Sequence, residues 1–387
     1  MGIADAAVGE LARRARVTGR LGIDTEFMGE GRYRTLLCLV QVAVLDGGEE
    51  AHVEVLDPLA GDHDPAPLAG ALADPAVEVL VHAGRQDVAL LRRAWATDVR
   101  GLFDTQIAAG FAGLRAQMGY EALLGEVLGV RLRKSASFTR WDARPLTPEQ
   151  VEYAREDVLH LIQLAEALQE RLERKGRLEW AREECRALED VSDERDLGAV
   201  FERLPRVASL DPAQRAVARE LVEWREQTAR EGDRPVPSVL ADAALVEIAK
   251  RRPASLERLA NIRGINEGTL RRRGRAIVEA VARGREREPI PVEGERPPPV
   301  DPADAPLIAL GEALVRARAA EAGLAYELLA ARADLQRVVT SVRLDTPEPR
   351  VRTLEGWRRE VVGEELLELL RGRGSLRVSG GRLAVDR

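Results

Sequence analysis

Three strand-like segments follow one another within residues 21–57, and this succession constrains the fold more than any other feature of the sequence. The segments read LGIDTEF, LLCLVQVAVL and HVEVLD, and turn-forming residues separate them at 29–31 and 46–48. Short strands joined by tight turns favour an antiparallel start to a sheet. A short helix is expected before them, within residues 1–20.

The pattern then changes to an alternation of helices and strands. We expect helices near 66–73, 85–95, 119–128 and 148–174, an apolar strand at 77–82 and a short strand ending at Phe103-Asp104. Three meandering strands followed by this alternation predict an α/β domain, a mixed sheet flanked by helices.

Strand signals disappear after residue 190. Residues 213–284 have the apolar periodicity of helices, 285–305 are dense in proline and charge, and a second helical block follows. We therefore predict an α/β domain at 1–190, two all-α domains at 205–284 and 306–387, and a linker at 285–305. At 387 residues, two or three domains are expected.

The second helical block faintly repeats the first. Gly274 and the apolar positions after it match Gly363 and its successors, and Val239-x5-Leu245 matches Leu329-x5-Leu335. Leucine-rich helices resemble one another by chance, so duplication remains one interpretation. The first block alone carries Arg271, Arg272, Arg273 and Arg275 together, which makes it the candidate for phosphate binding.

The composition limits where the protein is expected in the cell and which metal ions it could bind. No apolar run reaches the 18 or so residues needed to span a membrane, and the N-terminus lacks an apolar signal core, so a cytoplasmic protein is expected. Cys38 and Cys185 lie in unlike contexts, and no Cys/His cluster has zinc spacing. A metal would therefore be held by carboxylates, which favours Mg²⁺ or Mn²⁺.

Net charge does not decide the partner. The value of −7 argues against a polyanion, but a metal-binding acidic site contributes charge that its ions cancel. The bias toward arginine suits phosphate contacts and equally fits a GC-rich genome. No Lys follows a Gly, so there is no phosphate-binding loop, and a helicase or a nucleoside triphosphate cofactor is excluded.

Asp24 and Glu26 are the first candidate metal ligands. Residues two apart on a strand project to the same face. Two carboxylates side by side on an otherwise apolar strand repel one another and are costly to desolvate, and a divalent ion removes both penalties. An edge strand with a solvated face is the alternative, but the flanking apolar residues argue against it.

Asp87, Tyr153 and Asp157 complete the candidate set. Asp87 follows a buried strand and opens a helix, where complementing the helix dipole is a sufficient alternative role. Tyr153 and Asp157 are one turn apart, well inside a helix that Thr147 caps with Gln150 in a capping box. Four carboxylates can hold two ions for phosphodiester hydrolysis, with the Tyr orienting or deprotonating water.

In order and spacing these motifs resemble the tyrosine-bearing branch of the exonucleases with four acidic residues. Residues 18–174 resemble the ribonuclease D family in particular, through Phe103-Asp104-Thr105, Leu132-Arg133-Lys134-Ser135 and Arg144-Pro145-Leu146-Thr147. The resemblance implies a ribonuclease H-like fold and two Mg²⁺ or Mn²⁺ ions on Asp24, Glu26, Asp87 and Asp157. It also implies 3′→5′ cleavage that releases 5′-mononucleotides.

The helical blocks resemble the HRDC domain. The first matches through Leu221, Trp224-Arg225, Pro235-Val-Pro237 and Gly274, whereas the second lacks a counterpart of Trp224-Arg225. One nuclease domain followed by two such modules is the ribonuclease D layout. The resemblance implies single-stranded 3′ ends of RNA, such as transfer RNA precursors, as partners, and a monomer is expected.

Candidate substrate contacts lie beside the acids and in a basic segment before the last predicted helix. They are Thr25, Phe27, His82, Lys134, Arg140, Trp141 and Arg144. The basic segment could equally be a solvated loop with one anchoring Trp, and Arg140 stands where the family usually has Asp. His82 is better interpreted as a hydrogen-bonded structural histidine, and Asp104 as a turn or cap residue rather than a fifth ligand.

Three functions stay open. The first is an RNA 3′-end exonuclease, which the HRDC pair and the 103–157 match favour. The second is a DNA exonuclease of the same superfamily, whose active site would be the same. The third is a non-catalytic nucleic-acid-binding scaffold, against which the presence of all four acids and Tyr153 argues.

Overall fold

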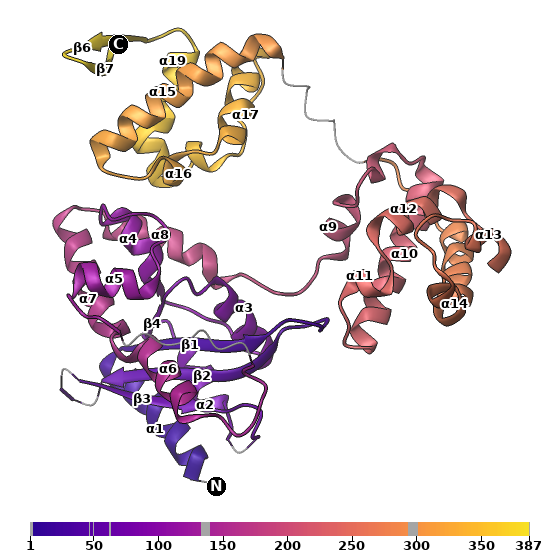
Figure 1. Ribbon diagram of the computed structural model, residues 1–387. Helices are drawn as coiled ribbons and strands as arrows, with labels where there is room; N and C mark the ends of the chain where they lie inside the picture. Colours follow the sequence, from indigo (N-terminus) through magenta and orange to yellow (C-terminus); the bar gives the residue numbers. More distant parts are fainter. Residues whose placement is uncertain are drawn as a thin grey trace.

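The structure is a computed structural model, and it describes residues 3–45, 47–48, 50–61, 63–132, 140–292 and 301–386. Figure 1 shows an N-terminal domain built around a sheet and two separate groups of helices. Every helix in the described ranges is either too short or too polar to cross a lipid bilayer.

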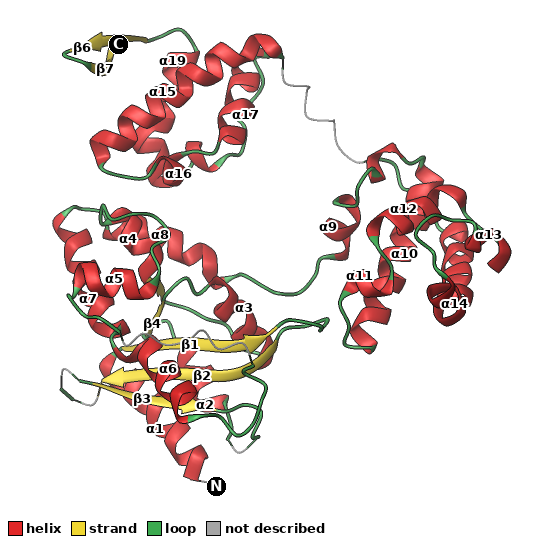
Figure 2. Cartoon of the chain, in the orientation of Figure 1, coloured by secondary structure: helices red, strands yellow, loops and turns green. Residues whose placement is uncertain are grey.

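The N-terminal domain is organised by a five-stranded sheet with the strand order β3-β2-β1-β4-β5 (Figure 2). The strands β1, β2 and β3 form an antiparallel meander, and β4 and β5 continue the sheet parallel to β1. They are β1 (Arg20–Met28), β2 (Leu36–Leu45), β3 (Ala51–Leu56), β4 (Glu78–Val81) and β5 (Leu102–Asp104). The predicted mixed sheet is confirmed, and β1 is its central strand.

Helices cover both faces of this sheet. One face packs against α1 (Ile3–Thr18), α2 (Ala66–Leu72) and α3 (Arg85–Ala94). The other packs against α4 (Thr105–Phe111), α5 (Tyr120–Val127), α6 (Pro148–Leu159) and α7 (Leu161–Arg174). The helix α8 (Leu178–Glu189) lies beside β5 and contributes to both cores.

Strand alternation decides which face of the sheet carries the acids. Leu21 and Ile23 are buried in the core beneath α1. Gly22 faces the other way, where a Cβ atom would lie 3.3 Å from the Leu161 side chain of α7. Asp24 and Glu26 have the same parity as Gly22, so they project toward the layer of α6 and α7.

The predicted helix at 148–174 is two helices, because the chain leaves the helical conformation at His160. The first segment, α6, packs on β1, β2 and β3, whereas α7 packs on α4, α5 and β4 and also contacts β1 and β2. The break redirects the chain from β3 toward α4 and α5. The short helix α4 is not evident in the sequence pattern and begins where Asp104 caps it.

A first group of helices has its own core and contacts the N-terminal domain at the turn between β1 and β2. Asp233 accepts hydrogen bonds from the Arg32 guanidinium at 2.8 Å and from the Tyr33 backbone N–H at 3.1 Å. The elements are α9 (Leu197–Glu202), η1 (Val207–Ser209), α10 (Pro212–Glu231), α11 (Val236–Val239), α12 (Asp242–Arg251), α13 (Leu256–Ala260) and α14 (Glu267–Glu286).

The C-terminal group corrects two predictions. Strands return after residue 190 as a hairpin around Gly380-Gly381, a turn that the sequence did signal. The linker is shorter than 285–305, since helices occupy both of its ends and 293–300 lie outside the described residues. The elements are η2 (Pro302–Asp304), α15 (Ala305–Ala322), α16 (Tyr326–Leu329), α17 (Arg332–Arg343), η3 (Arg352–Leu354), α18 (Gly356–Arg358), η4 (Arg359–Gly363), α19 (Glu364–Leu370), β6 (Ser375–Ser379) and β7 (Arg382–Asp386).

This C-terminal domain is docked on the N-terminal domain at α4 and α8, next to which it lies in Figure 1. Trp357 is 2% exposed and stacks on Trp180 at 5.3 Å, with Phe111 edge-on at 4.9 Å. Glu184 accepts two hydrogen bonds from the Arg358 guanidinium, at 2.5 and 2.7 Å, and one from Trp357 Nε1 at 3.1 Å. Aromatic burial and a bidentate ion pair, in which Arg358 is buried and Glu184 is partly exposed, therefore fix the C-terminal domain in place.

Replacing Arg358 by Ala is expected to release this docked domain. Removing one partner of a buried ion pair costs about 3 kcal/mol, so small-angle scattering should give a larger radius of gyration and proteases should cut more readily between the domains. Arg373→Ala is the control, because its ion pair with Glu368 is exposed at the surface. Unchanged scattering from Arg358→Ala would contradict a docking role for this pair.

Candidate active site

Asp24 and Glu26 lie where β1 extends beyond its neighbour β4. The strand β4 pairs with β1 only opposite residues 20–22, whereas β2 pairs with residues 22–28. One side of β1 is therefore open at the two acids, and both carboxylates project toward α6. The strand β1 is still the middle strand of the sheet and not an edge strand, but at Asp24 and Glu26 it is paired on the β2 side only.

Asp87 approaches from the first turn of α3, where it is 7% exposed. The buried Thr25 hydroxyl, from the residue between the two β1 acids, donates a hydrogen bond to Asp87 Oδ1. Thr25 was predicted to contact the substrate, but its side chain is instead committed to Asp87. Asp87 therefore does more than complement a helix dipole, because a side chain of the central strand binds it.

Tyr153 and Asp157 come from α6, which packs across β1, β2 and β3. The predicted capping box at the start of this helix is confirmed: Thr147 accepts from the Gln150 N–H, and the Gln150 side chain accepts from the Thr147 N–H. The cap fixes where α6 begins, and with it the turn on which the phenol and the carboxylate stand.

The four carboxylates influence one another electrostatically. Burial, followed by Asp87, Asp157 and Glu26, raises the pKa of Asp24 well above its usual value. Burial, followed by Asp157 and Asp87, raises the pKa of Glu26 to about 8. Burial raises the pKa of Asp157 to about 7 and raises that of Asp87, against which the Thr25 hydrogen bond acts. The four acids thus form one cluster of partly desolvated like charges.

The donor set fits hard divalent cations. Within the described residues, none of the four carboxylates forms an ion pair with an arginine, lysine or histidine. In the same part of the chain, no three acidic, imidazole or thiol groups are already gathered at ligand spacing. The four acids therefore offer oxygen atoms without a basic partner in the described part of the chain, and all-oxygen ligands suit Mg²⁺ or Mn²⁺.

Tyr153 is half-buried against Trp141, whose ring lies 5.9 Å away at a 38° tilt. Burial, followed by Asp157, Glu26 and Asp24, raises the pKa of the Tyr153 phenol above its usual range. The phenol keeps its proton near neutral pH, so it suits orienting a water molecule better than deprotonating one. Trp141 itself is 3% exposed, so little of its ring is open for the stacking on substrate that was predicted.

Arg144 also has a supporting position rather than the predicted substrate contact. Its guanidinium donates to both Asp57 carboxylate oxygens at 2.6 Å, to the Trp141 carbonyl at 2.8 Å and to the Cys38 carbonyl at 3.1 Å. These bonds tie the loop before α6 to the ends of β2 and β3. Arg144 therefore holds Trp141, and through it the platform behind Tyr153.

The remaining predicted contacts have different surroundings. Phe27 is partly buried against the core beneath α1. His82 is half-buried, with Nδ1 2.9 Å from the Thr105 hydroxyl, in agreement with a structural role. Arg140 is exposed and pairs with Asp142 at 3.0 Å. Lys134 lies outside the described residues.

The four clustered arginines of the first helical domain do not all have the same surroundings. Arg271, Arg272 and Arg275 are exposed along α14. Arg273 donates to the Ser238 and Val239 carbonyls, so it holds α14 against α11. Burial, followed by the neighbouring charge of Arg272, lowers the pKa of Arg273. The exposed members of this group remain available to phosphate.

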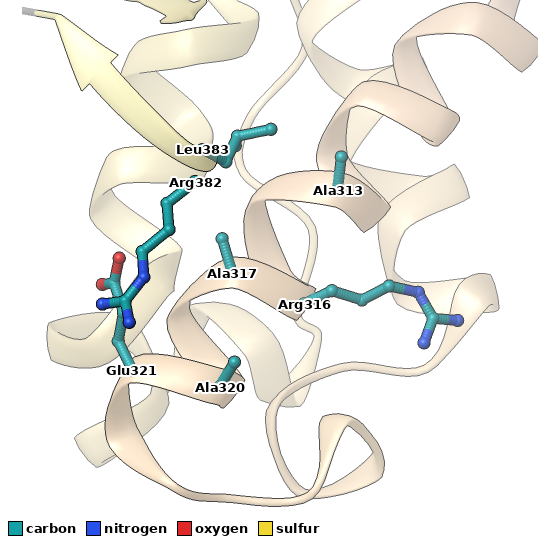
Figure 3. Close-up of a pocket in the computed structure, with 7 residues that line it drawn as sticks. All are labelled: Ala313, Arg316, Ala317, Ala320, Glu321, Arg382 and Leu383. Carbon is teal, nitrogen blue, oxygen red and sulfur yellow. The ribbon is translucent and has the colours of Figure 1, made fainter. Parts of the chain in front are cut away.

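A hollow of about 600 Å³ in the C-terminal domain has a different character (Figure 3). Alanines of α15 form one wall and the hairpin residues Arg382 and Leu383 the other. Glu321 is the one acidic residue of its lining. The lining residues are Ala313, Arg316, Ala317, Ala320, Glu321, Arg382 and Leu383. This hollow lacks the carboxylate chemistry of the site on β1.

Two residues near the site, Asp57 and Tyr120, were not among those predicted from the sequence. Asp57, the partner of Arg144, ends a predicted strand directly before a proline. This position at the strand end was the one feature of the sequence that could have pointed to a structural role for Asp57. Tyr120, at the start of α5, has a buried hydroxyl, and its ring lies 5.4 Å from that of His82. Burial, then Asp157, raises the pKa of the Tyr120 phenol, so the phenol lies within electrostatic reach of the carboxylate cluster.

Comparison with known proteins agrees with this architecture. A family model described as 3′-5′ exonuclease matches residues 4–173, and a model of the HRDC domain matches residues 214–281. The structure of Escherichia coli RNase D, described as an exoribonuclease involved in structured RNA processing, is similar with a TM-score of 0.79 and 28% identity. That similarity covers 95% of this chain and 97% of the other.

Curated relatives extend the similarity over the whole chain. Ribonuclease D of Gluconacetobacter diazotrophicus is 38% identical, over 96% of this chain and 93% of its own length. Ribonuclease D of Granulibacter bethesdensis is 37% identical, over 94% of this chain and 90% of its own length. The fold and the carboxylate site define a 3′→5′ exonuclease with an HRDC module. The chain belongs to the ribonuclease D family and is a 3′→5′ exoribonuclease.

Glu26→Gln is expected to stabilise the metal-free protein at alkaline pH. The folded protein raises the pKa of Glu26 to about 8, compared with 4.5 for an unperturbed Glu. Because the folded state binds this proton more tightly, stability falls as pH rises from 4.5 to about 8. In a chelator, thermal unfolding should give Glu26→Gln the higher Tm at pH 8, with a difference that vanishes below pH 4.5.

Glu149→Gln is the control for this measurement. Glu149 is exposed in the first turn of α6, and hydrogen bonds from its own N–H and from Thr147 lower its pKa. Its contribution has the opposite sign, so Glu149→Gln should leave Tm at pH 8 unchanged or slightly lower. A lower Tm for Glu26→Gln at pH 8 would contradict the repulsion within the cluster.

Arg144→Ala is expected to lower kcat by up to roughly 100-fold, with KM changed little, because the misplaced group is Tyr153. Arg140→Ala offers the contrast, since Arg140 is exposed and should affect KM alone if it contacts RNA. Steady-state kinetics on one single-stranded RNA substrate measure both variants. A raised KM with unchanged kcat for Arg144→Ala would restore Arg144 as a substrate contact.

Proposed function

We propose that this exoribonuclease uses two divalent ions, Mg²⁺ or Mn²⁺, to hydrolyse phosphodiester bonds at single-stranded 3′ ends and to release 5′-mononucleotides. The observation that carries the proposal is the cluster of Asp24, Glu26, Asp87 and Asp157, whose charges have no basic partner among the described residues. Such a cluster is costly without cations, so cation binding is the natural reason for its presence.

The carboxylates and the residues around them would divide the work between metal binding, water orientation and support. The carboxylates of Asp24, Glu26, Asp87 and Asp157 would hold the ions, which when bound lower the pKa of water and stabilise the charge on the leaving oxygen. The protonated phenol of Tyr153 would hydrogen-bond the attacking water and fix its direction. Thr25 keeps Asp87 in place, and Trp141 supports Tyr153 from behind.

We propose stable RNA precursors, transfer RNA among them, as substrates. Support comes from the similar Escherichia coli enzyme, which is described as acting in structured RNA processing. The exposed arginines of α14 offer phosphate contacts at a distance from the site. Arg140 and the segment containing Lys134 would contact the RNA nearer to the cleaved bond.

We further propose that the C-terminal domain is a divergent HRDC-like copy of the first. In both domains a long helix is followed by a four-residue helix and then by a third helix, as α10, α11 and α12 and as α15, α16 and α17. Val239 and Leu329 end the four-residue helices, and Leu245 and Leu335 are the matching buried positions of the third. A shared ancestor explains this correspondence.

The test incubates the protein with 5′-labelled single-stranded RNA and DNA, with Mg²⁺ or Mn²⁺ and with a chelator. We expect a ladder that shortens from the 3′ end of RNA, is absent with the chelator, and is reduced by at least roughly 10³-fold in Asp24→Ala. A ladder on DNA alone would indicate a DNA exonuclease. Absence of both ladders would favour a non-catalytic scaffold.

A further inference from the structure

The connection between β4 and α3 determines where Asp87 stands. The strand ends at Val81 and the helix begins at Arg85, so the chain reverses its course within three residues. Ala83 has a left-handed backbone, with φ +55°, which costs a non-glycine residue free energy. Gly84 lies so close to Val81 that a Cβ atom would be 2.6 Å from it. A strained and tightly packed turn thus carries a metal-ligand candidate.

This turn is held by the carboxylate of Asp104, at the end of the neighbouring strand β5. Asp104 Oδ1 accepts from the Ala83 N–H at 3.0 Å, and Oδ2 accepts from the Gly84 N–H at 2.9 Å. The same carboxylate caps α4 by accepting from the Gln106 N–H at 2.8 Å and the Ile107 N–H at 3.4 Å. Asp104 is 2% exposed. One buried carboxylate therefore joins two helix N-termini.

Thr105 continues the same connection. Its hydroxyl donates to the Val81 carbonyl at 3.0 Å and lies 2.9 Å from His82 Nδ1. Because the hydroxyl has a single hydrogen, His82 Nδ1–H donates to it when Val81 accepts. Asp104 and Thr105 together thus hold four consecutive residues, Val81 to Gly84.

Capping α4 does not explain these contacts. A helix N-cap needs one acceptor oxygen, which Ser, Thr or Asn would supply equally well. Two oxygens are required here because a second segment, the turn before α3, also needs acceptors. Gly84, the N-cap residue of α3, has no side chain to cap its own helix. Asp104 does not replace this cap; it binds the N–H groups of Ala83 and Gly84 directly before the helix, and Asp87 follows one turn later.

We propose that Asp104 is a positioning residue for hydrolysis: it fixes the β4–α3 turn so that Asp87 stands where it can hold a divalent ion, with Thr105 in the same task. The inference rests on the proposed metal-dependent function. Backbone N–H groups of the turn and of α4 occupy the Asp104 carboxylate, so its effect would pass through Asp87. Loss of such outer contacts weakens metal binding by roughly 10- to 100-fold in other metal sites.

The test compares Asp104→Asn with Asp304→Asn in the full-length protein. Asparagine keeps one acceptor but turns an NH₂ group toward a backbone N–H. Asp304 is a matched control because it is 1% exposed and accepts from Arg343 Nε at 2.7 Å, within the C-terminal domain. Mn²⁺ binding is measured by calorimetry without RNA, and the Mn²⁺ concentration for half-maximal RNA cleavage is measured separately.

We expect Asp104→Asn to weaken Mn²⁺ binding and to raise the half-maximal concentration by roughly tenfold, with activity recovering at high Mn²⁺. Asp304→Asn should lower Tm alone. An Asp104→Asn protein that loses Tm but keeps wild-type metal affinity would overturn the proposal. If Asp104→Asn does not fold, Thr105→Val decides by the same two measurements. Wild-type protein without Mn²⁺ binding or cleavage would instead refute the proposed function itself.

Discussion

Repulsion among four desolvated carboxylates is the constraint around which the N-terminal domain is arranged. Asp24 and Glu26 project from the central strand, Asp87 comes from the helix after β4, and Asp157 comes from α6, and burial raises the pKa of each. A fold that unites such groups needs rigid supports, since the acids on their own would separate. The open side of β1 beyond β4 provides the place, and neighbouring elements provide the supports.

Several residues that resemble substrate contacts in the sequence are these supports. Arg144 is fully engaged with Asp57 and with carbonyl groups, Trp141 is buried beneath Tyr153, and Thr25 binds Asp87. Arginine and tryptophan beside an acidic site suggest nucleic-acid contact by type alone. Their roles depend on what surrounds them, because an arginine saturated by carbonyls and a carboxylate has no donors left for phosphate.

The two helical domains are attached to the nuclease in different ways. The first contacts the β1–β2 turn through Asp233, with Arg32 and the Tyr33 backbone, and its ion pair is half-exposed. The C-terminal domain is docked through Trp357 and Arg358 on α8, with a buried Trp357 ring and an ion pair that is buried on its Arg358 side. The difference in burial predicts a difference in mobility, because exposed ion pairs contribute little to a fixed orientation.

The sequence by itself determined the order of strands and helices along the N-terminal domain, the carboxylate pair on its central strand, and the capped helix that carries Tyr153 and Asp157. It also indicated the family. These features depend on local periodicity and on the spacing of motifs. The hairpin at 375–386 was also legible there, through alternation around Gly380-Gly381, but was not predicted. Only the tertiary structure decided that 148–174 breaks into two helices and that Asp104 joins two turns. Both outcomes depend on contacts between segments far apart in sequence, and no local pattern encodes which surfaces a helix must follow or which N–H groups a distant carboxylate will meet.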